Sequence, residues 1–159
     1  MKIAVLMLTI AVLAATIPNV SEAAEGVPVE VQTPQALMQW MQKDFTYAMK
    51  MPDKPQSVEE TINRKKGDCD DFAVLAQSAL SEMGIKSHVI IIEFKGLNVK
   101  HAVCVWKDTN GTYNIISNRK QYRTGKPNVR QAISKYYPDW QRIVYSNAKR
   151  QHVSTETRA

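Results

Sequence analysis

One helical pattern followed by three strand patterns limits most strongly what this chain can fold into. Apolar side chains recur at helical spacing after Asp68 and stop at Gly84, which indicates a buried helix of about four turns. Three segments rich in β-branched and aromatic residues follow: SHVIIIEF (87–94), HAVCVW (101–106) and TYNIIS (112–117). The pair Asn110-Gly111 is typical of a hairpin turn between the last two. This order predicts an α+β fold in which a central helix carrying Cys69 packs on a small antiparallel sheet.

Two shorter helices are expected before the central one. Thr33-Pro34 has the pattern of an N-cap followed by proline at the first helical position. Ser57 and Glu60 form a capping-box pattern for the second helix. We expect that helix to end near Lys66, with Gly67 as its C-terminal stop.

The two ends of the chain are not expected to belong to the folded domain. Residues 1–23 combine Lys2, a short apolar run and the small-residue pattern Ser21-Glu22-Ala23, which is typical of a cleaved signal peptide. The apolar run has about 13 residues and is too short to span a membrane. We therefore expect an exported protein, periplasmic or secreted, with one domain over residues 24–147 and a basic tail without regular structure over residues 148–159.

The segment after Arg119 is basic and is expected to be mainly loop, with a short helix over residues 129–137 and a strand over 142–145. The whole chain has 21 Lys and Arg against 15 Asp and Glu, a net charge of +6. The basic residues are scattered and lack interleaved aromatic side chains, which favours a solvated surface and argues against nucleic acid as a partner. His152 lies in the tail and is given no function.

Cys69 lies in the first turn of the central helix pattern, between Asp68 and Asp70. The N-terminus of a helix favours an anion, so we expect a lowered pKa for this thiol and a reactive thiolate. In an exported chain with two cysteines, a disulfide with Cys104 is the competing interpretation. Strand alternation places Cys104 on the face opposite His101, so a Cys69 that meets His101 does not readily meet Cys104.

A thiolate nucleophile needs a base within hydrogen-bond reach and a third group that holds the base. His88 and His101 each begin a predicted strand. We favour His101, because the strand that follows it ends in Ser117-Asn118, and a side chain there could accept a hydrogen bond from the other ring nitrogen.

The run GDCDDFAVLAQSALSEMGI (67–85), followed by HAVCVW and YNIISN, resembles the core of the transglutaminase-like superfamily, in particular its bacterial cysteine-peptidase branch. The resemblance extends upstream through DFTY (44–47) and SVEETINRKKG (57–67). It implies a papain-like core with Cys69 as nucleophile and His101 as base. The family's third residue is an aspartate, and Ser117 takes its place here. We favour Asn118 as the orienting group because of its longer side chain, with Ser117 as the alternative.

The resemblance also implies a calcium site, because acidic residues flank the cysteine in the bacterial branch. Asp68 and Asp70 match that placement, and oxygen ligands suit a hard cation. The competing interpretation, which we favour, is that Asp68 caps the helix and that Asp70 and Asp71 lie in its first turn. The sequence requires no cofactor.

The leading hypothesis is an exported cysteine peptidase or amidase that acts on protein or cell-wall peptide. Water as acyl acceptor makes it a hydrolase, and an amine makes it a crosslinking transglutaminase. A catalytically weak or inactive binding module with the same fold is the alternative, favoured by Ser117. We expect a monomer that does not span the membrane.

Overall fold

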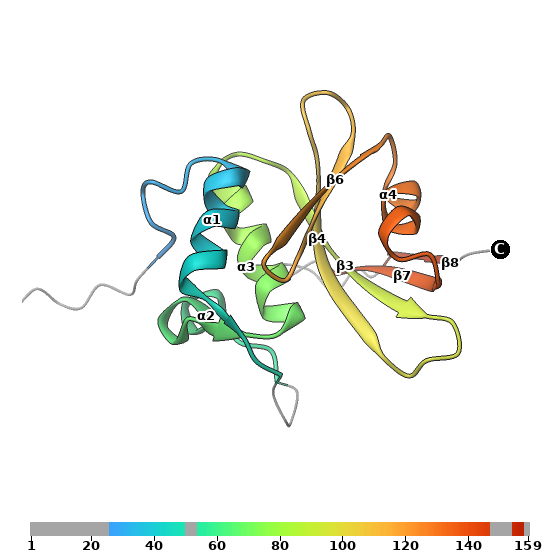
Figure 1. Ribbon diagram of the computed structural model, residues 1–159, viewed down its shortest axis with the longest axis horizontal. Coiled ribbons are helices and arrows are strands. Elements are labelled where there is room, and N and C mark those ends of the chain that lie inside the picture. Colours follow the sequence, from blue (N-terminus) through green and yellow to red (C-terminus); the bar gives the residue numbers. More distant parts are fainter. Residues whose placement is uncertain (1–25, 50–53, 147–153, 158–159) are drawn as a thin grey trace, which may run out of the picture.

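The computed structural model describes residues 26–49, 54–146 and 154–157, which form three layers (Figure 1). Helices α1 (Pro34–Asp44), α2 (Val58–Arg64) and α3 (Cys69–Glu82) cover one face of a sheet, and α4 (Val129–Tyr136) covers the other. The predicted α+β fold, with the cysteine helix packed on an antiparallel sheet, is confirmed. The predicted signal peptide and His152 lie outside the described residues.

The helix starts follow the sequence signals. Thr33 Oγ1 accepts a hydrogen bond from the backbone N–H of Ala36 at 3.1 Å, and Ser57 Oγ accepts one from Glu60 at 3.0 Å. Each bond satisfies a backbone donor that the first turn leaves unpaired. The two caps fix where α1 and α2 begin.

The end of α2 differs from the prediction that Gly67 stops it. Lys65 is the C-cap, in the left-handed conformation with φ 51°. The chain then enters strand β2 (Lys66–Gly67), which pairs in parallel with β1 (Thr46–Tyr47). The prediction was wrong because the chain turns at Lys65, two residues earlier. A glycine at position 67 instead allows the backbone to pack closely against Asp71, because a Cβ there would lie 2.8 Å from that side chain.

The main sheet has six strands in the order β6-β5-β4-β3-β7-β8, with all neighbours antiparallel. Its strands are β3 (Ser87–Phe94), β4 (Lys100–Lys107), β5 (Tyr113–Ser117), β6 (Lys120–Lys126), β7 (Trp140–Ser146) and β8 (Ser154–Thr157). Strand β6 occupies a segment that was expected to be loop. Thr124 is its one fully buried side chain, so the segment lacks the apolar alternation that would have revealed it.

The C-terminal tail also differs from the prediction. Residues 154–157 form β8, which pairs with β7 from Arg142↔Thr157 to Tyr145↔Ser154. The edge of β7 offers unpaired backbone groups, and a short threonine-containing segment satisfies them. The expectation of an entirely unstructured tail is therefore wrong for these residues.

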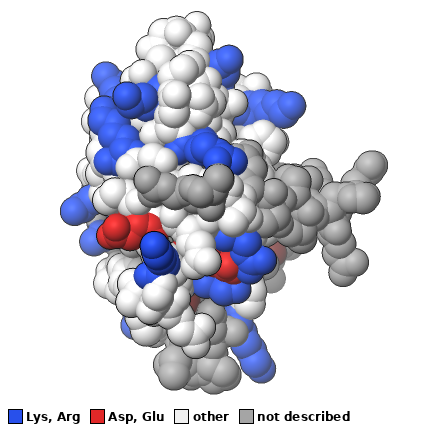
Figure 2. Space-filling view, turned by 90° about the vertical axis from the view of Figure 1, so that its right-hand side faces the viewer, with Lys and Arg blue, Asp and Glu red and all other residues white. Residues whose placement is uncertain are grey.

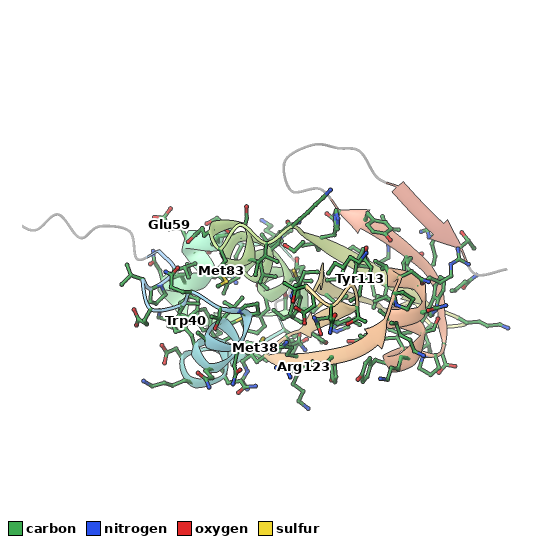
Figure 3. The ribbon with its side chains drawn as sticks, turned by 90° about the horizontal axis from the view of Figure 1, so that it is seen from above. Met38, Trp40, Glu59, Met83, Tyr113 and Arg123 are labelled. Carbon is green, nitrogen blue, oxygen red and sulfur yellow. The ribbon has the colours of Figure 1, made fainter. Side chains whose placement is uncertain are left out.

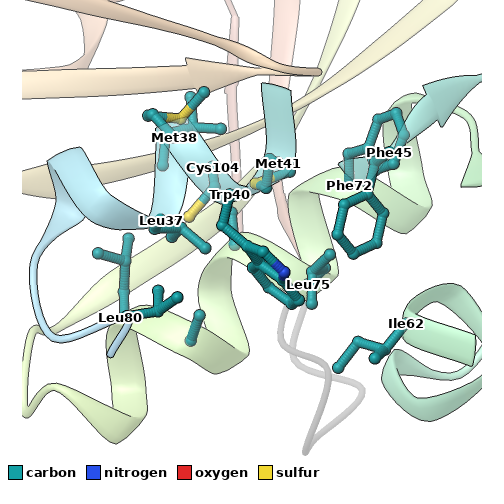
Figure 4. Packing of buried hydrophobic residues seen from close by; sticks show 14 of the residues in the cluster. Leu37, Met38, Trp40, Met41, Phe45, Ile62, Phe72, Leu75, Leu80 and Cys104 are labelled. Atoms are coloured by element: carbon teal, nitrogen blue, oxygen red, sulfur yellow. The ribbon is translucent and has the colours of Figure 1, made fainter. Parts of the chain in front are cut away.

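Two hydrophobic cores lie on the two faces of the sheet. The larger joins α1, α2 and α3 to Cys104, Trp106 and Ile116 of the sheet (Figure 4). The second joins α4 to the alternate strand residues, including Val103 and Val105. The view from above shows Trp40 among the helices and Tyr113 on the sheet (Figure 3). The strands β4 and β5 thus contribute buried side chains to both cores.

The basic residues are distributed over the surface, as the sequence predicts. On the side of the molecule that carries α4, Lys and Arg side chains occupy most of the coloured surface, and Asp and Glu occupy small areas (Figure 2). Part of this charge is paired, since Glu93 lies 2.6 Å from Arg142 and 3.0 Å from Lys100.

Candidate active site

Cys69 is the first residue of α3, immediately after the N-cap Asp68. The backbone N–H of Asp68 donates to Asp71 Oδ2 at 3.0 Å, which closes the turn at the helix start. Cys69 is a free, half-buried thiol that packs against Ala73, Val89 and Ala102. The prediction of a reduced, partly exposed thiol at a helix N-terminus is confirmed.

Cys104 is the second cysteine, and it is fully buried and unbonded. It lies among Leu37, Met38 and Trp40 in the helical core (Figure 4). Burial raises its pKa to about 12, so this thiol stays protonated. Cys104 lies on the sheet face that α3 covers, whereas the ring of His101 packs on Tyr137 at the end of α4. The predicted alternation of Cys104 and His101 therefore holds, but Cys104 shares the face of the helix that carries Cys69. The disulfide alternative is therefore not formed in this structure.

The electrostatics at Cys69 differ from the expectation of a lowered pKa. Burial raises the pKa of the thiol, and the charges of Asp68 and Asp70 raise it further. The backbone N–H of Ala102 donates toward the sulfur and acts in the opposite sense. The lowering of the Cys69 pKa by the helix N-terminus is thus smaller than the raising by burial and by the two aspartates, and Cys69 rests as a thiol.

His101 lies on β4, directly before the Ala102 amide that contacts Cys69. Its Nε2 lies 2.7 Å from Ser117 Oγ at the end of β5. Ser117 thus occupies Nε2, and Nδ1 is the ring nitrogen on the other side of the imidazole. Burial lowers the pKa of the half-buried imidazole, which favours its neutral form.

The structure brings Ser117, and not Asn118, to His101. Strand β5 ends at Ser117, and Asn118 has φ 51°, a left-handed turn conformation that asparagine tolerates. Asn118 Oδ1 is buried with no hydrogen-bond partner among the described residues. The preference for Asn118 as the partner of His101 is therefore wrong, because the turn aims its side chain elsewhere.

His88 lies elsewhere on the sheet. It pairs with Val105, four residues along β4 from His101, a separation of about 13 Å. Its ring packs on Tyr145, with centroids 5.9 Å apart. Burial and the charge of Lys86 lower its pKa. His101 is the histidine that the structure brings to the neighbourhood of Cys69.

Two tyrosines of the site were missed by sequence reasoning. Tyr137, at the end of α4, packs its ring on His101 with centroids 5.6 Å apart. Burial raises the pKa of Tyr137, and a charge on Cys69 raises it further. Tyr47 on β1 is also within range of a charge on Cys69. The resemblance included Tyr47 within DFTY, but the sequence carries no signal for Tyr137.

Asp68, Asp70 and Asp71 bring carboxylate oxygens within 4.8 Å of one another. The oxygens of Asp71 are already used, since they accept the backbone and side-chain N–H groups of Gln56 at 2.8 and 2.7 Å. Asp70 Oδ1 accepts from the backbone N–H of Asp71 at 2.9 Å. The donor set suits calcium in chemistry, but it supplies only part of the six to eight oxygens that this ion takes.

Two open hollows border the site. One, of about 460 Å³, is lined by Tyr47, Ser117 and Lys120 among others. The other, of about 390 Å³, is lined by Gln56, Gly67 and Arg64 of α2, and by Ala48 and Met49, which follow β1. Tyr47, which lines the first hollow, pairs with Gly67, which lines the second and lies two residues before Cys69.

The family model described as a transglutaminase-like domain matches residues 16–138. The chain belongs to the transglutaminase-like family. No curated protein matches the sequence. Among solved structures, calcium-bound LapG of Legionella pneumophila is similar, with 21% identity, a TM-score of 0.54 and coverage of 77% of this chain and 67% of LapG. EGTA-treated LapG gives 19% identity, a TM-score of 0.52 and coverage of 80% and 72%. These likenesses support the transglutaminase-like fold.

Proposed function

We propose that this transglutaminase-like protein is a cysteine peptidase or amidase that cleaves or transfers acyl groups of protein or cell-wall peptide. The observation that carries the proposal is the position of Cys69, at the start of α3 and against the amide that follows His101. The two flanking hollows support an extended peptide substrate. The reacting carbonyl carbon of the substrate would then lie over Cys69 Sγ.

In this mechanism Cys69 Sγ attacks the substrate carbonyl carbon while His101 Nδ1 takes the thiol proton. The pKa of Cys69 is raised and that of His101 is lowered, so the pair rests as thiol and neutral imidazole. Proton transfer then accompanies attack, as in general-base catalysis. His101 returns the proton to the leaving amine, and water or a second amine attacks the thioester.

A non-catalytic binding module is the second candidate, and a specific observation favours it. Ser117 stands where the family has an aspartate, so the imidazolium formed during attack gains no countercharge from this position. The opposing argument is that Cys69 contacts the backbone amide of Ala102, the residue that follows His101.

The deciding experiment is intact-mass analysis after incubation with a peptide-based electrophile, followed by a turnover assay on peptide substrates. We expect one adduct on the wild type and on the matched control Cys104→Ala, and none on Cys69→Ala. Turnover with a fluorescent primary amine measures the share of transfer against hydrolysis. An adduct without any turnover would favour the binding module, and no adduct would contradict both enzyme forms of the proposal.

Calcium is part of the proposal. LapG is described in a calcium-bound form, and here Asp68 and Asp70 are the residues that would hold the ion, with water completing its shell. Bound calcium would supply a positive charge beside the helix start. Asp71 would keep its hydrogen bonds to Gln56.

Export before action is also proposed, to the periplasm or the medium. The support is the signal-peptide pattern of residues 1–23. None of the helices in the described part of the chain has the length and apolar character of a membrane-spanning segment. N-terminal sequencing of the protein recovered from cell fractions tests this, and a retained Met1 in the cytoplasmic fraction would contradict it.

A further inference from the structure

The Ser117 hollow is the hollow of about 460 Å³ that has Ser117 in its lining, and it borders both members of the proposed catalytic pair. The Oγ atom of Ser117 lies 2.7 Å from His101 Nε2. Tyr47 lines the same hollow and pairs with Gly67, two residues before Cys69. A peptide whose carbonyl group reacts at Cys69 would therefore place a nearby side chain in the Ser117 hollow.

Two walls of this hollow are held together by reciprocal hydrogen bonds. Gln42, near the end of α1, donates from Nε2 to the carbonyl oxygen of Arg119 at 3.0 Å. Arg119 Nη1 in turn donates to the carbonyl oxygens of Gln42 and Phe45, at 3.2 and 2.6 Å. These bonds join the turn between β5 and β6 to the segment that leads into β1. The hollow is therefore preformed, and a ligand does not have to order its walls.

The charge of the Ser117 hollow is positive and uncompensated. Among the described residues its lining has two cationic side chains, Arg119 and Lys120, and no acidic one. The hydrogen bonds of Arg119 go to neutral carbonyl groups, so they leave its charge in place. Lys120 is exposed, and in the described part of the chain neither residue has a carboxylate partner.

The second hollow, of about 390 Å³, uses its arginine differently. Arg64 lies 3.2 Å from Glu60 and donates to Gln56 Oε1 at 3.0 Å, so much of its charge is compensated. A substrate carboxylate is therefore better stabilised in the Ser117 hollow. We propose that the Ser117 hollow binds an acidic side chain of the substrate peptide, and that Lys120 determines this specificity.

The remaining lining suits such a side chain. The ammonium group of Lys120, on a flexible stem, can form a charge-assisted hydrogen bond with a carboxylate. Tyr47 and Tyr122 offer ring surface to the methylene groups and hydroxyl groups as further donors. The inference rests on the proposed function for the nature of the ligand, a peptide.

The test compares two pools of fluorescent octapeptides, acetylated and amidated at their ends, in which one central position is fixed as Glu or Gln and all others are uncharged. Fluorescence anisotropy measures their binding to the full-length Cys69→Ala protein. We expect the Glu pool to bind about fivefold more tightly, as one favourable exposed ion pair allows. Lys120→Gln should remove most of this preference, and about 0.5 M NaCl should weaken it by screening.

The matched control is Lys107→Gln, which removes the same charge from the other end of β5, opposite Tyr113 and about 13 Å from Ser117. It should keep the preference for Glu. Equal binding of the two pools, or an equal loss in Lys107→Gln, would overturn the inference. A loss in Lys66→Gln without one in Lys120→Gln would also overturn it, because Lys66 lines the second hollow.

A third pool, with Gln and a free C-terminal carboxylate, separates the two sources of a carboxylate. If only this pool gained affinity that depends on Lys120, the assignment to an acidic side chain would be wrong. Binding needs no turnover, so a Lys120-dependent preference in a protein without turnover would contradict the proposed function alone. Equal turnover of the Glu and Gln pools by the wild type, with equal binding, would contradict this inference alone.

Discussion

The carboxylate of Asp71 holds Gln56 at two points, by its backbone N–H at 2.8 Å and by its side-chain Nε2 at 2.7 Å. Both residues are buried, with exposed fractions of 1% for Asp71 and 8% for Gln56. Asp71 also accepts from the backbone of Asp68. One buried carboxylate therefore fastens the segment before α2 to the turn that presents Cys69.

Asp71→Asn should lower the stability of the fold and leaves the Cys69 side chain unchanged. The amide NH₂ would face the donors of Gln56 or Asp68, leaving buried groups unpaired at a cost of about 2–3 kcal/mol. Urea unfolding measures the loss. Glu59→Gln, at an exposed position of α2, is the control and should change little. A loss below about 0.5 kcal/mol for Asp71→Asn would show that the clamp is not important for stability.

Gly67→Ala should also be destabilising, because the new Cβ would lie 2.8 Å from both Cβ and Oδ2 of Asp71. Relieving that overlap moves the Asp71 clamp or the β1–β2 pair, at a cost of about 1–3 kcal/mol. Gly26→Ala is the matched control, since nothing lies within 4 Å of its added Cβ. Thermal unfolding of the two variants compares them directly. Equal melting temperatures would contradict the tight fit.

Acid should weaken the fold through the half-buried His88 and His101. Burial lowers the folded-state pKa of His101 and His88, so below the unfolded value of about 6.5 the unfolded chain binds more protons. The unfolding free energy should therefore fall from about pH 7 to about pH 5, before most carboxylates titrate. His101→Gln and His88→Gln should each make the decline shallower. A wild-type free energy that is flat or rises over this interval would contradict the assignment.

Calcium should stabilise the protein if Asp68 and Asp70 hold it. At a free calcium concentration of about 100 times Kd, the gain is about 2.7 kcal/mol, which a thermal-shift assay reads as a higher Tm. Addition of EGTA should reverse the gain, and Asp70→Asn should abolish it. Asp108→Asn is the control, because that carboxylate lies in the exposed turn before β5. No response at millimolar calcium would remove the ion from the proposed function.

The central part of the fold could be predicted because its signals are local. Strand β3 coincides with SHVIIIEF, and α3 begins at the cysteine, since apolar residues at a fixed period define each element. Strands β6 and β8 escaped prediction for the opposite reason. They lie at the two ends of the main sheet, and polar edge strands carry little apolar alternation.

Only those site residues could be predicted from the sequence whose residue type alone indicates their chemical role. Cys69 and His101 stand out because a nucleophile and a base need those side chains. The choice between Ser117 and Asn118 depends on where β5 ends, and one residue of difference reverses the direction of a side chain. Tyr137 depends on α4 packing across the sheet from α3, a tertiary arrangement that no local pattern encodes.

Strand β8 matters for any shortened form of the protein. It covers the outer edge of β7, which includes Ile143 and Val144. Deleting residues 147–159 would leave that edge with unpaired N–H and C=O groups beside apolar side chains. Such an edge is a template for a strand of another molecule. We therefore expect β8 to protect against aggregation. The truncated protein should precipitate at concentrations at which the full chain stays dispersed.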